Sequence, residues 1–238
     1  MKPVFIFLFT LICLPVLAQE TIINDKNAQV RSITDFTGIR VSGGIDIFLS
    51  QGDSYSLAVS ASDNKYRDNI ITDVKGGILV ISYNNDRFRL GAGDKKLRAY
   101  ISFTMLESLE ASGACDVTIT GTLNANSMLI NLSGECDIKG AVKINDLALN
   151  LSGASTVNIN GSAENINITA SGASDVKNYD LVTQNCVAKL SGACDVRITV
   201  RNSISASASG VSTLHYEGDP GKKDVVTSGR STVSQKNR

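Results

Sequence analysis

The tripeptide Ser-Gly-x recurs through the second half of the chain, and this repeat limits the possible folds more than any other feature. Its copies are spaced 18 to 21 residues apart and begin at Ser112, Ser133, Ser152, Ser171, Ser191, Ser209 and Ser228. Similar residues follow each copy, as in Ala114-Cys115-Asp116-Val117 and Ala193-Cys194-Asp195-Val196. A period near 19 residues indicates a chain built from stacked copies of one small unit.

Residues on both sides of each Ser-Gly alternate between apolar and polar side chains, which predicts β-strands. Leu147, Leu149 and Leu151 share one parity before a corner, and Cys115 and Val117 share one parity after it. Each repeat therefore consists of two or three short strands with one apolar face. Such a unit cannot bury that face alone, so neighbouring units must stack.

Stacking predicts an all-β fold, a right-handed single-chain β-helix (solenoid) with coils of about 19 residues and parallel strands about 4.8 Å apart. A left-handed hexapeptide helix would need strict six-residue sub-periods, which are absent. An antiparallel sandwich would give no reason for Ser-Gly at one place in every repeat. We expect structural roles at the corner glycines, which are Gly113, Gly134, Gly153, Gly172, Gly192, Gly210 and Gly229.

Residues 30–105 carry strand patterns without the 19-residue period, and we interpret them as an antiparallel β cap. A cap protects the open end of a solenoid, which is otherwise an unpaired strand edge. The repeats then occupy residues 106–238, continuous with the cap as one structural unit. Lysines and arginines make the last coils polar.

The first residues have the pattern of a secretory signal peptide, predicted to span residues 1–18. Lys2 precedes an apolar run at 4–14, and Val16-Leu17-Ala18 is a small-residue cleavage site. The run is shorter than the ~20 residues that a membrane-spanning helix needs, and no other stretch approaches that length. We therefore expect an exported protein without a transmembrane segment after signal removal, located in the periplasm, on the outer membrane surface or outside the cell.

Composition excludes several functions. The chain has 23 basic and 23 acidic residues and no basic block, which argues against a nucleic-acid partner. His215 is its one histidine, so most histidine-based metal sites and catalytic triads are excluded. We expect no cofactor and no catalytic residues.

An outward slot after each corner holds the candidate site residues Asp116, Asp137, Asp175 and Asp195. Stacked carboxylates could bind calcium, or could supply the acid and base of a polysaccharide hydrolase. Lys139, Lys177 and Arg197 stand two residues later on the same face, however. Structural pairing is the simpler interpretation, so we assign no metal site.

Four cysteines remain after signal removal: Cys115, Cys136, Cys186 and Cys194. By strand parity all four point inward, and Cys115 and Cys136 occupy the same slot in adjacent coils. Serine occupies that slot in other repeats, so the position requires a small side chain. We expect buried free thiols with a structural role at Cys115 and Cys136, with a disulfide between those two as the alternative in an exported protein.

The segment that begins Phe36-Thr37-Gly38-Ile39-Arg40-Val41, with Gln51-Gly52-Asp53 and the repeated Ser-Gly-Ala-x-Asp-Val, resembles the head GIN domain family of auto-transporter adhesins. The resemblance covers about residues 35–235. It implies a β-helical fold and an envelope or extracellular location in a Bacteroidetes-type bacterium, and it brings no defined catalytic or binding residues.

Together these features predict a non-enzymatic interaction or adhesion module of the bacterial cell envelope. It would present a polar β-helix surface to a glycan or protein partner at the cell surface. Two alternatives stay open: a polysaccharide-degrading enzyme that uses the aspartate row, and a purely structural envelope component.

Overall fold

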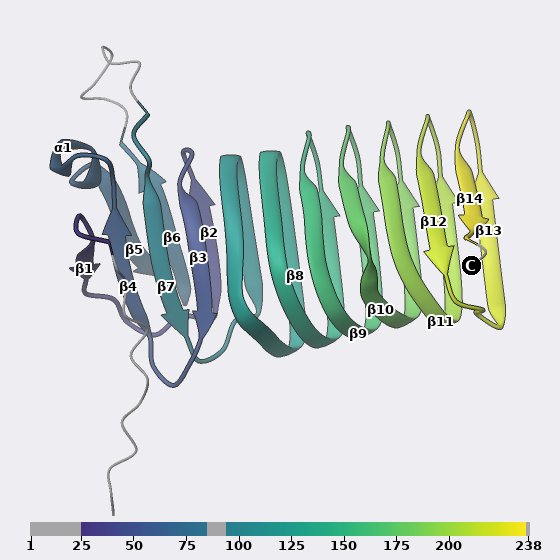
Figure 1. Ribbon diagram of the computed structural model, residues 1–238, viewed down its shortest axis with the longest axis horizontal. Coiled ribbons are helices and arrows are strands. Elements are labelled where there is room, and N and C mark those ends of the chain that lie inside the picture. Colours follow the sequence, from purple (N-terminus) through teal and green to yellow (C-terminus); the bar gives the residue numbers. More distant parts are fainter. Residues whose placement is uncertain (1–24, 85–93, 237–238) are drawn as a thin grey trace, which may run out of the picture.

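A computed structural model of the chain describes residues 25–84 and 94–236. The predicted signal peptide at 1–18 lies outside these residues. The described part is almost entirely β-structure, with 14 strands in one continuous sheet and the short helix α1 (Asn64–Arg67). Figure 1 shows the sheet wound into an elongated solenoid, which confirms the predicted all-β fold.

The repeats form parallel coils in the C-terminal two thirds of the solenoid. Each strand hydrogen-bonds to its equivalent one coil away, so that Asp137 stands beside Thr156, Thr156 beside Asp175 and Asp175 beside Asp195. The strands are β8 (Ser108–Leu151), β9 (Thr156–Ala170), β10 (Asp175–Leu190), β11 (Asp195–Ala208), β12 (Thr213–Glu217), β13 (Lys222–Thr227) and β14 (Thr232–Gln235).

The winding is right-handed, as predicted. In Figure 1 the chain runs down the near side along β12, crosses at the lower edge, and rises along β13 on the far side while advancing toward the C-terminus. We call the sheet formed by the strands after each Ser-Gly corner, including β12 and β14, the near face. The sheet formed by the strands before each corner, including β13, is the far face.

Aliphatic side chains from successive coils stack inside the solenoid and form its core. One such row lies under the near face and is completely buried; its members are Ile47, Val117, Ile138, Val157, Val176, Val196 and Leu214. Each buried aliphatic side chain contributes about 1.5–3 kcal/mol relative to exposure. The apolar parity seen in the sequence is therefore the parity that faces the core.

The N-terminal region combines parallel coils with an antiparallel cap. Strands β2 (Gly38–Ser42) and β3 (Asp46–Gln51) pair in parallel with β8 on one side and with β6 (Ile78–Tyr83) and β7 (Arg98–Phe103) on the other. The antiparallel pairs bring in β1 (Gln29–Arg31), β4 (Ser56–Ser60) and β5 (Ile70–Lys75). The predicted antiparallel cap is thus present. Part of the same region, β2, β3, β6 and β7, forms parallel coils of the solenoid.

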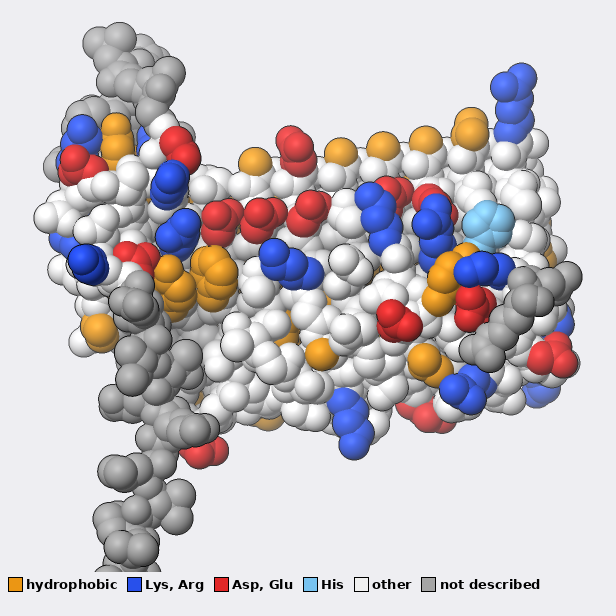
Figure 2. Space-filling model, in the orientation of Figure 1, with side chains coloured by type: hydrophobic (Ala, Val, Ile, Leu, Met, Phe, Trp, Pro, Cys, Tyr) orange, Lys and Arg blue, Asp and Glu red, His pale blue; other side chains and the backbone are white. Residues whose placement is uncertain are grey.

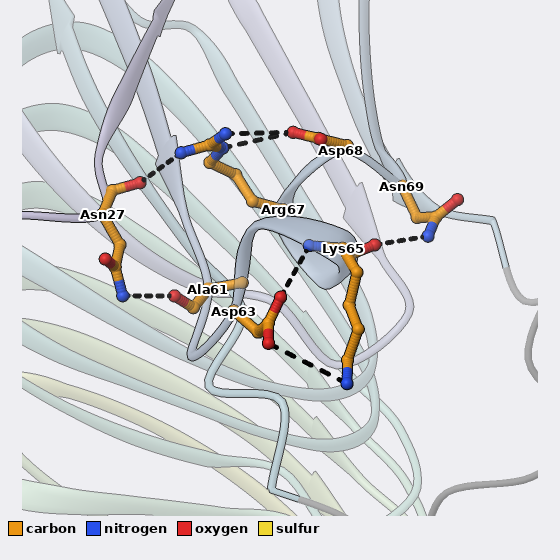
Figure 3. Close-up of polar contacts among 7 residues, drawn as sticks. All are labelled: Asn27, Ala61, Asp63, Lys65, Arg67, Asp68 and Asn69. Carbon is orange, nitrogen blue, oxygen red and sulfur yellow. Dashed lines mark hydrogen bonds and ion pairs between the residues drawn. The ribbon is translucent and has the colours of Figure 1, made fainter.

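Polar contacts fasten the first described residues to the loop that carries α1 (Figure 3). Asp63 caps the helix by accepting a hydrogen bond from the backbone N–H of Lys65 at 2.9 Å. The Asn27 side-chain amide donates to the carbonyl of Ala61 at 3.1 Å, and Arg67 donates to the carbonyl of Asn27 at 3.2 Å. These bonds connect the first described residues to the segment that follows β4. No helix within the described ranges is long and apolar enough to cross a membrane.

Candidate functional surface

The Ser-Gly corners stack along one edge of the solenoid and bring backbone atoms close together. Gly153 has φ +79°, and a Cβ added to it would lie 2.4 Å from the carbonyl oxygen of Gly134. The same oxygen accepts the backbone N–H of Ala154 at 2.7 Å. The contact recurs at 2.4 to 2.7 Å for Gly134, Gly172, Gly192, Gly210 and Gly229, whereas Gly113, at the start of the row, has more space. The row therefore combines a left-handed backbone with a close approach, and both favour glycine.

The slot two residues after each corner glycine holds cysteine or serine, and in both cases the side chain is a hydrogen-bond donor. Cys136 donates from Sγ to the carbonyl of Ser133 at 3.3 Å, and Ser174 donates from Oγ to the carbonyl of Ser171 at 3.0 Å. Cys115, Cys194, Ser155 and Ser212 make the same bond. The sequence indicated that this slot requires a small side chain, but not that the side chain must donate a hydrogen bond. Cysteine and serine both can, through a thiol or a hydroxyl.

The four cysteines in the described part of the chain are buried free thiols. Burial raises the pKa of Cys186 to about 12. The neighbouring thiol of Cys136 lowers the pKa of Cys115, and the neighbouring thiol of Cys115, together with burial, raises the pKa of Cys136. A buried thiol whose pKa is raised stays protonated at neutral pH, and the thiolate is the nucleophile, so Cys136 and Cys186 are unreactive.

The donor role leads to a prediction at Cys136. Cys136→Ser should change the free energy of unfolding by less than about 1 kcal/mol, because the hydroxyl keeps the bond to the Ser133 carbonyl. Cys136→Leu should destabilise by about 1–3 kcal/mol, because the larger side chain overfills the slot. Urea unfolding measures both, with Ser174→Cys as the reciprocal control. Equal losses for serine and leucine at position 136 would contradict the donor role.

The aspartate slot forms a row along the near face, visible in Figure 2 as a line of acidic side chains. Asp175 pairs with Lys177 at 3.1 Å, and Asp195 pairs with Arg197 at 2.6 Å. Exposed pairs of this kind contribute only ~0–1 kcal/mol. For Asp137 and Lys139, no ion pair is found in the described residues. No group of three or more metal-ligating side chains comes together in those residues either.

The sequence of residues 42–47 resembles a diverged copy of the later repeat unit, but the aspartate row was not extended to it from the sequence. Asp46 takes the aspartate slot one coil before Asp116, and it accepts the backbone N–H of Asp116 at 3.3 Å. Phe48 stands two residues later, and its ring stacks on that of Tyr100 with the centroids 5.1 Å apart and the planes at 21°. The alternation Ile45-Asp46-Ile47, which matches Cys115-Asp116-Val117, is the signal that could have revealed it.

The far face carries ladders of side-chain amides. Asn165 donates to Asp146, Asn185 donates to Asn165 and Asn202 donates to Asn185, with distances of 2.8 to 2.9 Å. Asn150 donates to Asn131 at 2.9 Å beside a shallow depression of about 420 Å³, which Glu110, Asn131, Asn150 and Thr169 help to line. Each amide both donates and accepts, so such ladders order the surface and leave hydrogen-bonding groups facing solvent.

His215 lies on the near face toward the C-terminal end. Its Nδ1 stands 2.8 Å from the hydroxyl of Ser234 in the next coil. No further histidine exists in the chain, and His215 belongs to no metal-binding group among the described residues. It therefore serves as a cross-coil hydrogen-bonding residue.

Comparison with known proteins identifies the fold. A putative adhesin from Bacteroides fragilis has a similar structure, with a TM-score of 0.78 and 23% identity, covering 89% of this chain and 98% of that one. A putative lipid binding protein from Parabacteroides distasonis has a TM-score of 0.64 and 18% identity, covering 90% and 98%. A putative adhesin from Parabacteroides merdae has a TM-score of 0.60 and 18% identity, covering 88% and 95%.

At these identities the similarity concerns the fold alone. Among curated proteins, none matches the chain. The family described as "putative auto-transporter adhesin, head GIN domain" matches residues 35–220, which is most of the sequence. The chain therefore belongs to the head GIN domain family.

Proposed function

We propose that the protein is an exported, non-enzymatic interaction module that acts in adhesion at the bacterial envelope. The observation that carries this proposal is the regular arrangement of outward polar side chains, in rows that run from coil to coil on both faces. A surface of this kind suits an extended contact better than the enclosure of a small substrate. The family description supports the same role, and the apolar run at 4–14 with its cleavage site supports export.

The arrangement of the carboxylates favours binding over catalysis. A glycoside hydrolase places two carboxyl groups on opposite sides of the scissile bond and raises the pKa of one of them. Here the aspartates lie side by side in one row, and Asp175 and Asp195 are held by Lys177 and Arg197.

Binding and catalysis can be tested in one experiment. We expect fluorescently labelled protein to bind intact cells or a glycan array, and Asp175→Asn and Asp195→Asn to bind equally well, because these carboxylates are already neutralised by partners. A reducing-sugar assay on the same glycans should detect no release. Reducing ends produced by the wild type and lost in the two variants would identify an enzyme. Absence of binding to every surface would favour a structural component.

A further inference from the structure

The outer row two residues after the aspartate slot changes its chemistry along the near face. In the later coils this row contains Lys177 and Arg197, which neutralise the aspartates beside them. At the cap end the same row contains Tyr100, Phe48 and Thr118, which are aligned by strand register. Equivalent positions of one row therefore hold basic side chains at Lys139, Lys177 and Arg197, and aromatic rings at Phe48 and Tyr100.

This change leaves Asp46 and Asp116 without a basic residue two positions later, and Lys139, which follows Asp137, forms no ion pair with it in the described residues. Asp46, Asp116 and Asp137 form no ion pair within the described ranges, and Asp116 and Asp137 are exposed. Arg98, beside Asp46 in the register, pairs with Asp25 at 3.8 Å, and its charge also acts to lower the pKa of Asp46. Burial, together with the nearby charge of Asp116, raises the pKa of Asp46. The cap end of the near face is therefore acidic. It lacks the ion pairs that Asp175 and Asp195 form in the later coils.

Apolar surface lies directly beside these carboxylates. The rings of Phe48 and Tyr100 are partly exposed on the outer side of the sheet, and the Tyr100 hydroxyl is occupied as a donor to Asp25 at 2.9 Å. Figure 2 shows apolar side chains immediately below the acidic row at this end. The surface consequently combines ring faces, which attract cations, with carboxylate acceptors.

We propose that this surface, made by Asp46, Phe48, Tyr100, Asp116 and Asp137, binds a lysine- or arginine-containing segment of a protein partner. The proposal rests on the interaction role proposed above. A basic side chain packs its aliphatic stem on a ring and directs its cation to a carboxylate. A neutral glycan fits less well, because it offers no cation to pair with these carboxylates.

The spacing of the row fits an extended segment. Neighbouring coils are about 4.8 Å apart, so the outer two carboxylates are separated by about 10 Å. An extended peptide places alternate side chains on one side about 7 Å apart. Two long basic side chains at positions i and i+2 can therefore reach the first and the last carboxylate of the row.

Fluorescence anisotropy with a labelled peptide of alternating lysine and serine tests the proposal on the full-length protein. We expect Phe48→Ser and Asp116→Asn each to weaken binding at least fivefold. Asp195→Asn, the matched control in a self-neutralised coil, should stay within twofold of the wild type. A peptide with acetylated lysines should not bind, and affinity for the lysine peptide should fall as salt is raised, because exposed charges are screened.

Several outcomes would overturn the proposal. Equal weakening by Asp116→Asn and Asp195→Asn would indicate diffuse charge attraction, and absence of peptide binding would exclude the site. Binding of chitosan oligomers in place of the peptide, with the same dependence on Phe48, would assign the surface to amino-glycans. Circular dichroism checks the fold of each variant, and exposed Asp116 keeps the test valid if Phe48→Ser is unstable. If cells are still bound by both variants as by the wild type, the adhesion role stands and this surface is wrong.

Discussion

Gly153→Ala is expected to destabilise the protein by about 3 kcal/mol or more, which places it among the severe single substitutions. The added Cβ would lie 2.4 Å from the carbonyl oxygen of Gly134, in a backbone with φ +79°. That oxygen belongs to backbone and cannot swing away as a flexible side chain could. It also accepts the N–H of Ala154 at 2.7 Å, so any shift weakens the bond between two coils. Urea unfolding followed by circular dichroism measures the loss.

Gly121→Ala is the matched control for this prediction. Gly121 has φ +76°, nearly the value at Gly153, but a Cβ added there meets no atom within 4 Å. The substitution should therefore cost only the left-handed backbone penalty of about 1–2 kcal/mol. The difference between the two variants isolates the close approach of the stacked corners. Equal losses at positions 121 and 153 would mean that backbone conformation alone explains the glycines.

The fold of the repeats could be predicted from the sequence because every coil obeys the same rule. Alternation put Val117, Val157 and Val196 on one parity, and they form a single buried row. The Ser-Gly spacing predicted one corner per coil, and the corners stack as expected. Repetition makes local patterns reliable, since each coil contacts mainly its neighbours.

The cap could not be predicted to the same depth, because its pairing is not local. Strand β7 pairs in parallel with β3, and β6 pairs in parallel with β2. The coil formed by β6 and β7 therefore lies on the N-terminal side of the coil formed by β2 and β3, although it comes later in the chain. No periodicity in residues 30–105 encodes that order. Asp46 could be aligned with the later repeats, but the position of Phe48 beside Tyr100 becomes known only once the coils are placed.

Side-chain bonding within the predicted site was only partly readable. Strand parity placed the aspartates and the basic residues on one outer face, and Asp175 and Asp195 have partners there. Strand parity predicts which face a side chain is on, but not its rotamer. It therefore could not show which neighbouring acidic and basic side chains form ion pairs. The bond from Cys136 to the Ser133 carbonyl was hidden in the same way, because it depends on the shape of the corner.

Removal of one complete coil should leave a folded protein, although it deletes 19 residues. Deletion of residues 156–174 joins Ser155 to Asp175, and Asp175 is the register partner of Thr156. Val176 would then stack on Ile138, and Gly192 on Gly153, as equivalents do now. One inter-coil interface is lost, so the free energy of unfolding should fall, and the urea m-value should decrease by roughly a tenth, in proportion to the chain removed.

A smaller deletion should do far more damage. Removal of residues 156–165 takes out only half a coil and exchanges the inward and outward positions of the strand residues that follow. Ile166, which is buried in the intact protein, would then point to solvent. Every later corner would also lie on the edge opposite to the earlier corners, so Gly172 would no longer stack on Gly153. We expect an aggregated product or one without a cooperative unfolding transition. If the ten-residue deletion folds as well as the 19-residue deletion, the coils do not depend on register, and the stacking that underlies the rows, the corners and the proposed binding surface would have to be rejected.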